Sequence, residues 1–248
     1  MKMEVPILTY LIAGTLLILV VAWPAFSQRS SFMLKDGETI VFLGDSITQS
    51  ASTPEGYVTL FERFCGVNGY EVKAINAGIS GHKSDDMLER LERDVLSHKP
   101  NWVSISCGVN DVWHSFMANH TGVPLPEYKK NITEMVERCQ KAGAKVLLLT
   151  STPIFENLDS PENKKLMDYN TFLRDLAKEK KLVLCDLFAA FSKVYRQKQG
   201  TENIMTTDGV HMQPKGYRLM AREIVHALGA SNGELAAAEQ RWELIYNP

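Results

Sequence analysis

Short apolar runs alternate with longer amphipathic segments along this chain of 248 residues, and few folds accommodate that order. The apolar runs have the composition of buried strands: Thr39–Leu43, Tyr70–Ile75, Trp102–Ser106, Lys145–Thr150 and Leu182–Asp186. The amphipathic segments are predicted helices: Tyr57–Val67, Ser84–His98, Pro126–Ala142, Glu162–Lys180, Leu187–Gln197 and Pro214–Leu228. Strands that alternate with helices at this spacing run parallel and are joined by right-handed crossovers. The pattern therefore predicts an α/β fold, a three-layer α/β/α sandwich.

The first predicted strand ends abruptly in Gly44-Asp45-Ser46. Loops that leave the carboxyl ends of parallel strands surround the crevice where ligands bind in open α/β sheets. Ser46 therefore lies where a nucleophile is useful, but a serine hydroxyl needs a histidine base, a carboxylate that orients the base, and donors for the oxyanion. We give Asp45 a structural role in capping or bracing the loops.

A candidate base follows much later, in Thr207-Asp208-Gly209-Val210-His211. An aspartate three residues before a histidine can turn its carboxylate onto Nδ1–H and leave Nε2 free to accept the serine proton. Taken alone, this spacing is more typical of a turn with a solvated histidine. Its position in a loop after the last strand, with Ser46 after the first, favours a catalytic pair.

Two further stretches follow predicted strands and contain candidate oxyanion donors. Asn110 could be an ordinary turn residue, or its side-chain amide could donate to the oxyanion. Gly78 could permit a tight turn, or it could bring a backbone N–H close to the reacting carbonyl because it lacks a Cβ. The N–H of Ser46 itself, at the start of a helix, would be another donor.

Together these stretches resemble the SGNH (GDSL-type) hydrolase family, whose motifs occur in the same order. The resemblance rests on Gly44-Asp45-Ser46, Asn76-Ala77-Gly78, Gly108-Val109-Asn110-Asp111 and Asp208-Gly209-Val210-His211. It implies a flavodoxin-like fold with five parallel strands, a serine esterase mechanism, and no metal or cofactor. The implied roles are Ser46 as nucleophile, His211 as base and Asp208 as the residue that orients it. The implied oxyanion donors are the N–H groups of Ser46 and Gly78 and the Asn110 side chain.

The substrate is less constrained than the chemistry. Trp113 and Phe116, after the Asn110 loop, are candidates for a substrate-binding wall, although aromatic residues in such loops also serve packing. His82 and His114 either line the crevice or are solvated loop histidines. Short loops favour a small acyl group, O-acetyl on carbohydrate. The alternatives are a lysophospholipase or thioesterase, an acyltransferase, and a non-catalytic binding module on the same fold.

The amino terminus differs from the remainder of the chain. Lys2 precedes an apolar run from Ile7 to Trp23, and small residues, Ala25 and Ser27, follow it. This is typical of a secretory signal peptide over residues 1–27, cleaved near Ser27, and the alternative is an uncleaved signal anchor. Residues 28–248 then form one hydrolase domain, secreted or periplasmic, that contacts a membrane only if the first segment is retained.

Net charge and the spacing of histidines, cysteines and carboxylates argue against a nucleic-acid partner and a bound metal. A net charge of −2 gives no reason to expect a nucleic-acid partner. No cluster of histidines, cysteines and carboxylates has metal-ligand spacing, so we expect no metal. The cysteines Cys65, Cys107, Cys139 and Cys185 are interpreted as small buried hydrophobic residues, although export would permit one disulfide.

Overall fold

The computed structural model describes residues 31–198 and 203–246. The predicted signal peptide or anchor, residues 1–27, lies outside the described residues. No helix in the described ranges is both long and apolar enough to cross a membrane.

Five parallel strands form one sheet in the order β2-β1-β3-β4-β5. The strands are β1 (Thr39–Gly44), β2 (Lys73–Gly78), β3 (Trp102–Ser106), β4 (Lys145–Leu149) and β5 (Val183–Cys185). This is the flavodoxin-like strand order, which reverses direction between β1 and β3 and places a ligand crevice there. The three-layer α/β/α prediction and the five parallel strands are confirmed.

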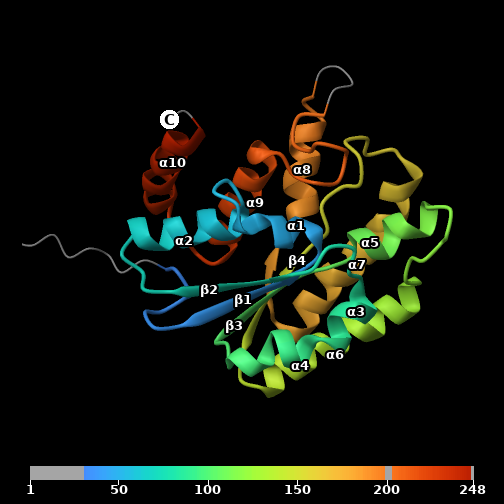
Figure 1. The fold of residues 1–248 in the computed structure, drawn as a ribbon, viewed down its shortest axis with the longest axis horizontal. Coiled ribbons are helices and arrows are strands. Elements are labelled where there is room, and N and C mark those ends of the chain that lie inside the picture. Colours follow the sequence, from blue (N-terminus) through green and yellow to red (C-terminus); the bar gives the residue numbers. More distant parts are fainter. Residues whose placement is uncertain (1–30, 199–202, 247–248) are drawn as a thin grey trace, which may run out of the picture.

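Helices cover both faces of the sheet (Figure 1). One face carries α1 (Ser46–Gln49), η1 (Ser50–Ser52), α2 (Tyr57–Val67), α8 (Leu187–Tyr195) and α9 (Pro214–Ala227), with α10 (Asn232–Tyr246) packed on α2 and α9. The other carries α3 (Ser84–Glu89), α4 (Leu91–Asp94), η2 (Leu96–His98), α5 (Val109–Trp113), η3 (His114–Phe116), α6 (Leu125–Lys141) and α7 (Pro161–Lys180).

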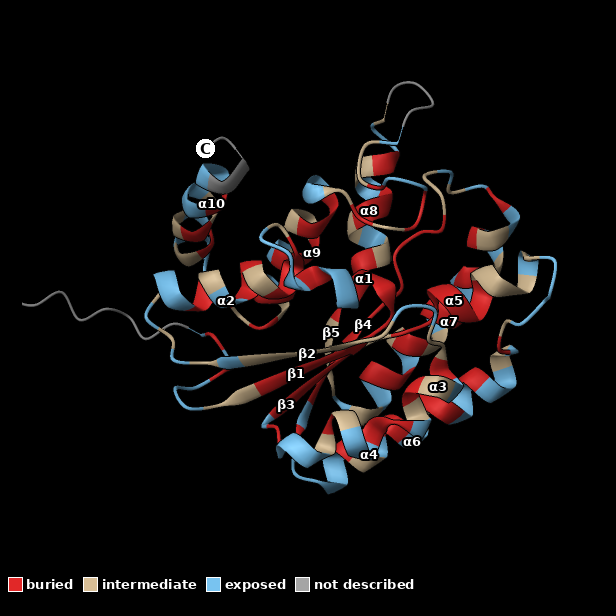
Figure 2. Cartoon of the chain, in the orientation of Figure 1, coloured by how far each residue is buried: buried red, intermediate tan, exposed pale blue. Residues whose placement is uncertain are grey.

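The core lies between the sheet and these two helical layers, and β1 and β3 are buried on both faces (Figure 2). Phe42 from β1 packs edge-on against Tyr57 and Phe61 of α2, with ring centroids 5.7 and 5.3 Å apart. Continuous apolar runs in these strands are therefore what a sheet covered on both sides requires. All four cysteines are buried and unpaired, as the sequence interpretation expected.

Most predicted elements agree with the structure to within two residues at each end, and two differ by more. Strand β2 begins and ends three residues later than expected, because its pairing partner Thr39 lies opposite Lys73. Tyr70 instead packs before the strand against Phe32, with ring centroids 4.7 Å apart. The helix expected over Ser84–His98 is broken at Arg90, where φ and ψ are −93° and 1°. Periodicity alone did not indicate this break.

Candidate active site

Ser46 begins helix α1 directly after strand β1, at the carboxyl edge of the sheet. The Asp45 side chain caps this helix by accepting the Ile47 N–H at 2.9 Å, which confirms the structural role expected for it. Gly44 is needed here because a Cβ would lie 1.9 Å from the Thr48 hydroxyl oxygen. The chain turns sharply at this point, and only 8% of the Ser46 surface is exposed.

His211 lies in hydrogen-bond contact with Ser46, although 165 residues separate them in the sequence. The distance from Ser46 Oγ to His211 Nε2 is 2.9 Å. On the other side of the ring, Nδ1 lies 2.6 Å from Asp208 Oδ2. An ionised carboxylate can only accept, so Nδ1 carries the hydrogen and Nε2 is the acceptor for the serine hydroxyl. This is the arrangement that a serine nucleophile requires.

The Asp208 carboxylate also holds its own loop. Its Oδ1 accepts the backbone N–H groups of Val210 at 2.9 Å and His211 at 2.8 Å. Burial by itself raises the pKa of Asp208, but the hydrogen bonds from His211 and Val210 outweigh it and hold the pKa below its usual value. The carboxylate therefore stays ionised beside the imidazole.

Two other carboxyl groups lie buried behind the serine. Burial raises the pKa of Asp45 from its usual 3.8 to about 6, against the hydrogen bond from Ile47. Burial likewise raises the pKa of Asp111 to about 6, although the Ser84 N–H donates to its Oδ1 at 3.0 Å. Neither group contacts Ser46 or His211 through a hydrogen bond among the described residues. Their role is to fix α1 and the start of α3.

Asn110, in the first turn of α5, reaches the loop that follows β2. Its side-chain Nδ2 donates to the His82 carbonyl oxygen at 3.0 Å, and a second hydrogen on Nδ2 remains for another acceptor. Arg90 also contacts the loop that follows β2. Its guanidinium is buried and donates to His82 Nδ1 at 3.0 Å and to the Gly44 carbonyl at 2.9 Å. Because arginine is always a donor, His82 presents a neutral ring with its hydrogen on Nε2.

Gly78 does not match the prediction that its N–H is an oxyanion donor. That N–H donates to the Asn76 side-chain oxygen at 2.8 Å and is therefore occupied. Gly78 is needed instead for packing, because a Cβ would lie 2.1 Å from the backbone nitrogen of Gln49. Three residues on, Gly81 has a φ of +78°, and its N–H has no acceptor among the described residues. It directly precedes His82, the residue that Asn110 contacts.

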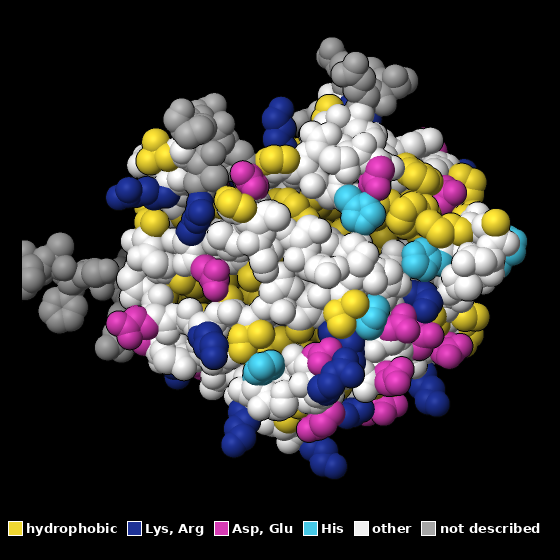
Figure 3. Space-filling model, in the orientation of Figure 1, with side chains coloured by type: hydrophobic (Ala, Val, Ile, Leu, Met, Phe, Trp, Pro, Cys, Tyr) yellow, Lys and Arg dark blue, Asp and Glu magenta, His cyan; other side chains and the backbone are white. Residues whose placement is uncertain are grey.

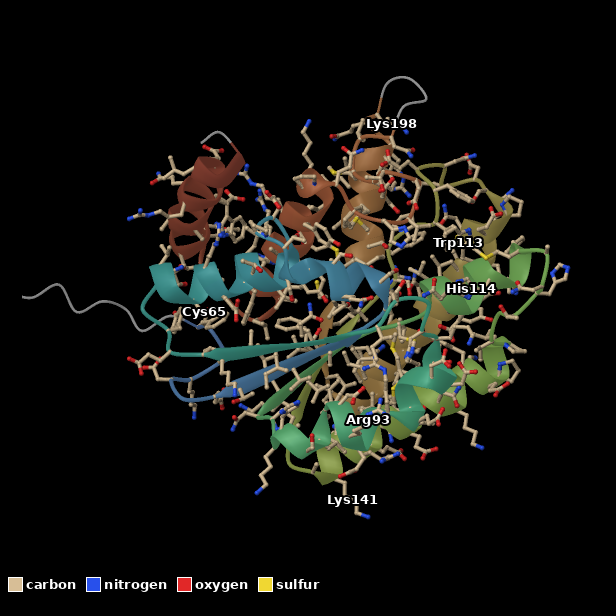
Figure 4. The ribbon with its side chains drawn as sticks, viewed as in Figure 1. Cys65, Arg93, Trp113, His114, Lys141 and Lys198 are labelled. Atoms are coloured by element: carbon tan, nitrogen blue, oxygen red, sulfur yellow. The ribbon has the colours of Figure 1, made fainter. Side chains whose placement is uncertain are left out.

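Aromatic side chains form a wall beside His211. The Trp113 ring lies 6.4 Å from the His211 ring and 6.4 Å from the Phe155 ring, centroid to centroid. Figure 3 shows hydrophobic side chains gathered on this part of the face, where Figure 4 labels Trp113 and His114. Phe116 lies further out, 44% exposed and beneath the Lys165 ammonium. Trp113 therefore borders His211, whereas Phe116 is an exposed residue at the rim.

A sequence profile of the GDSL-like Lipase/Acylhydrolase family matches residues 42–219, which contain Ser46, Asn110, Asp208 and His211. The chain belongs to this family. The resemblance drawn from its four motif stretches is thereby confirmed.

Several relatives match over most of this GDSL-like chain. An acetylxylan esterase of Geobacillus stearothermophilus is 29% identical over 209 residues, which are 78% of this chain and 94% of the relative. Esterase TesA of Pseudomonas aeruginosa is 28% identical over 179 residues, 70% of this chain and 79% of the relative. The crystal structure of an acetyl xylan esterase, AlAXEase, superimposes with a TM-score of 0.71 at 33% identity, covering 76% of this chain and 98% of that one. The chain is accordingly a serine carboxylic-ester hydrolase, and the alternative of a non-catalytic binding module is not favoured.

Sequence reasoning missed some residues of this GDSL-like site. Phe155 and Glu156 contact the loop that carries Asp208 and His211, and Arg90 contacts the loop after β2, but none of the three belongs to a motif. Phe155 and Glu156 lie in a loop that follows β4, and such loops border the crevice. That position was the only signal available. Among the described residues, no group of three or more histidines, cysteines or carboxylates could hold a metal ion.

Proposed function

We propose that this GDSL-family chain hydrolyses small acyl esters, above all O-acetyl groups on carbohydrate, by a Ser-His-Asp mechanism outside the cytoplasm. The observation that carries the mechanism is the chain of two hydrogen bonds from Ser46 Oγ to His211 Nε2 and from Nδ1 to Asp208.

The chemistry follows from this geometry. As Ser46 Oγ bonds to the ester carbonyl carbon, its proton passes to His211 Nε2, and Asp208 stabilises the imidazolium that forms. The carbonyl oxygen becomes an oxyanion. When the carbon–oxygen bond to the alcohol breaks, the Nε2 proton passes to the leaving alcohol. Water then attacks the acyl-enzyme carbonyl while His211 Nε2 takes its proton. The bond from the carbonyl carbon to Ser46 Oγ breaks, the Nε2 proton returns to Ser46 Oγ, and the carboxylic acid leaves.

Three groups are proposed as oxyanion donors. They are the N–H of Ser46, the remaining hydrogen of Asn110 Nδ2, and the N–H of Gly81 in place of Gly78. The Ser46 N–H is in the first turn of a helix, where no intrahelical acceptor exists. Asn110 and Gly81 lie next to one another through the hydrogen bond between Asn110 and His82. Donors of this kind each contribute about a hundred- to a thousandfold in rate.

The substrate class is supported by the relatives and by the site. Two of the similar proteins are named acetylxylan esterases. The Trp113 ring lies 6.4 Å from the His211 ring and 6.4 Å from the Phe155 ring, and aromatic faces suit the apolar faces of a sugar. A lysophospholipase or thioesterase would need an apolar groove for a long chain beside Ser46.

Two measurements test the proposal. A fluorophosphonate probe should label the native protein and leave Ser46→Ala unlabelled, and Ser46→Ala should lose esterase activity. Across nitrophenyl acetate, butyrate and octanoate, kcat/KM should fall by about tenfold or more toward the longest chain. Release of acetate from acetylated xylo-oligosaccharides identifies the alcohol portion. A preference for octanoate would refute the acetyl assignment but leave the Ser-His-Asp mechanism intact.

Export is proposed from the sequence of residues 1–27. Amino-terminal sequencing of the protein from the extracytoplasmic fraction should begin near Gln28. An amino terminus at Met1 in the membrane fraction would indicate a signal anchor instead.

A further inference from the structure

Glu156, in the connection between β4 and α7, places a buried carboxylate against the loop that carries His211. Its side chain is 1% exposed. Its oxygens accept the backbone N–H groups of three successive residues, Ile204 at 2.9 Å, Met205 at 2.8 Å and Thr206 at 2.9 Å. The Thr206 hydroxyl also donates to it, at 2.9 Å. One side chain therefore holds the segment that leads into Asp208.

Lys198 completes the surroundings of this carboxylate. Its Nζ lies 3.2 Å from Glu156 Oε2, and its side chain is 8% exposed. Figure 4 shows Lys198 beyond the end of α8. Burial by itself raises the pKa of Glu156, but the hydrogen bonds from Ile204, Met205 and Thr206 and from Lys198 hold it below its usual value. The group is therefore ionised, and hydrogen bonds to an ionised acceptor are the stronger kind.

The neighbouring residue makes a second contact with the same loop. Phe155 donates its backbone N–H to the Gly209 carbonyl at 2.7 Å. Its φ of +55° lies in the left-handed region, which is unfavourable for a residue with a Cβ and persists only where surrounding contacts maintain it. Phe155 and Glu156 together therefore contact the loop on both sides of Asp208.

The loop itself is internally tied. Thr206 and Met212 form an antiparallel bridge, and the Thr207 N–H donates to the His211 carbonyl at 2.8 Å. Asp208 and His211 consequently move as one unit. On its carboxyl side this unit continues into α9, where the Tyr217 hydroxyl donates to the Ile47 carbonyl at 3.1 Å. On its amino side, the hydrogen bonds to Glu156 are what fix its position.

We infer that Glu156 is a positioning residue, which sets the distance between His211 Nε2 and Ser46 Oγ by docking the amino side of the His211 loop. The inference rests on the proposed roles of Ser46, Asp208 and His211. Removing the carboxylate leaves the bond between Asp208 and His211 intact, because both groups lie within the unit. It leaves the Phe155 N–H to Gly209 bond as the remaining contact from this connection, so the amino side of the unit can shift relative to Ser46, which the sheet holds in place.

The test uses the full chain with nitrophenyl acetate. Glu156→Ala should lower kcat by about a hundredfold, since a displacement of about 1 Å at a reacting group costs that much. KM should stay within about twofold, because the substrate still binds. The rate at which a fluorophosphonate modifies Ser46 should fall by the same factor as kcat. Glu156→Gln keeps the shape and one acceptor oxygen, and we expect a smaller loss of about tenfold.

Asp186→Ala is the matched control. Asp186 accepts Arg174 Nε at 2.7 Å and caps α8 through the Ala189 N–H at 3.1 Å, but it does not contact the His211 loop. Its removal should lower the melting temperature and leave kcat within about twofold. Each variant is measured well below its own melting temperature, so that the folded fraction does not affect kcat.

The outcomes separate the two proposals. Ser46→Ala that keeps esterase activity refutes the proposed function. If Ser46→Ala is inactive while Glu156→Ala keeps kcat and the labelling rate within about twofold of the parent, the positioning role is wrong. The positioning role is also wrong if Glu156→Gln and Asp186→Ala lower kcat by the same factor at equal stability. The loss of activity would then be a general result of removing a hydrogen-bonded carboxylate.

Discussion

Replacing Asp208 by asparagine is expected to abolish most of the catalysis while leaving the fold almost unchanged. The asparagine oxygen can still accept the N–H groups of Val210 and His211, which now bond to Oδ1 at 2.9 and 2.8 Å. The other oxygen becomes an NH₂ group, which would face the hydrogen on His211 Nδ1 across a distance of 2.6 Å. Two donors cannot share that position.

The imidazole relieves this conflict by moving its hydrogen to Nε2. Nε2 then cannot accept the proton of Ser46, which lies 2.9 Å away. The same change of tautomer in a serine protease lowers kcat by about 10⁴-fold, and we expect a loss of this size, about 5.5 kcal/mol of transition-state stabilisation. Because the Asp208 side chain is 48% exposed, the free energy of unfolding should change by less than about 1 kcal/mol.

The assay is the initial rate with nitrophenyl acetate, together with thermal unfolding of the same preparations. Asp159→Asn, which removes an exposed carboxylate from the loop between β4 and α7, is the control and should behave as the parent. If Asp208→Asn keeps more than about a tenth of the parent kcat, the carboxylate does not fix the tautomer and the reasoning is refuted.

Three further predictions concern the surroundings of the site. Because burial raises the pKa of Asp45 from 3.8 to about 6, the folded state binds more protons than the unfolded state between these values, and this group lowers stability as pH rises through that window. The free energy of unfolding of Asp45→Asn, measured by urea unfolding, should therefore rise relative to that of the parent by up to about 3 kcal/mol between pH 4 and pH 7. A difference between the two proteins that does not change with pH would contradict this. Phe116→Ala should raise KM for acetylated xylo-oligosaccharides by about three- to tenfold and leave nitrophenyl acetate kinetics unchanged, because the ring is at the rim; equal effects on both substrates would place it nearer the serine. Gly78→Ala should lower the free energy of unfolding by about 2 to 4 kcal/mol, because its Cβ would lie 2.1 Å from the Gln49 backbone nitrogen. Gly81→Ala, whose Cβ meets open space, should lower it by about 1 kcal/mol. Equal melting temperatures for the two variants would show that Gly78 is not a packing residue.

The sequence alone determined the order of layers and the place of the nucleophile. The strand Trp102–Ser106 and the helix Tyr57–Val67 have the predicted bounds, because each is specified by its own periodicity and turn residues. A parallel sheet then brings the loops after β1, β2 and β3, with Ser46 and Asn110, to one edge. The spacing of Asp208 and His211 fixes their contact with each other. Their loop joins α8 to α9, so its approach to Ser46 depends on tertiary contacts.

Only the tertiary structure decided which groups are already occupied. Local sequence allows the Gly78 N–H to donate to an oxyanion, but the Asn76 side-chain oxygen accepts it, and Asn76 Nδ2 in turn donates to the Thr48 carbonyl, 28 residues away. Arg90 interrupts a periodic helix because its guanidinium turns inward to the Gly44 carbonyl, a partner 46 residues away. In the sequence Glu156 is an ordinary loop residue. Only the structure shows that its carboxylate accepts the backbone N–H groups of residues 204–206. Hydrogen bonds between distant segments depend on how the whole chain packs. Periodicity and motif spacing describe only local sequence, so they do not predict these bonds.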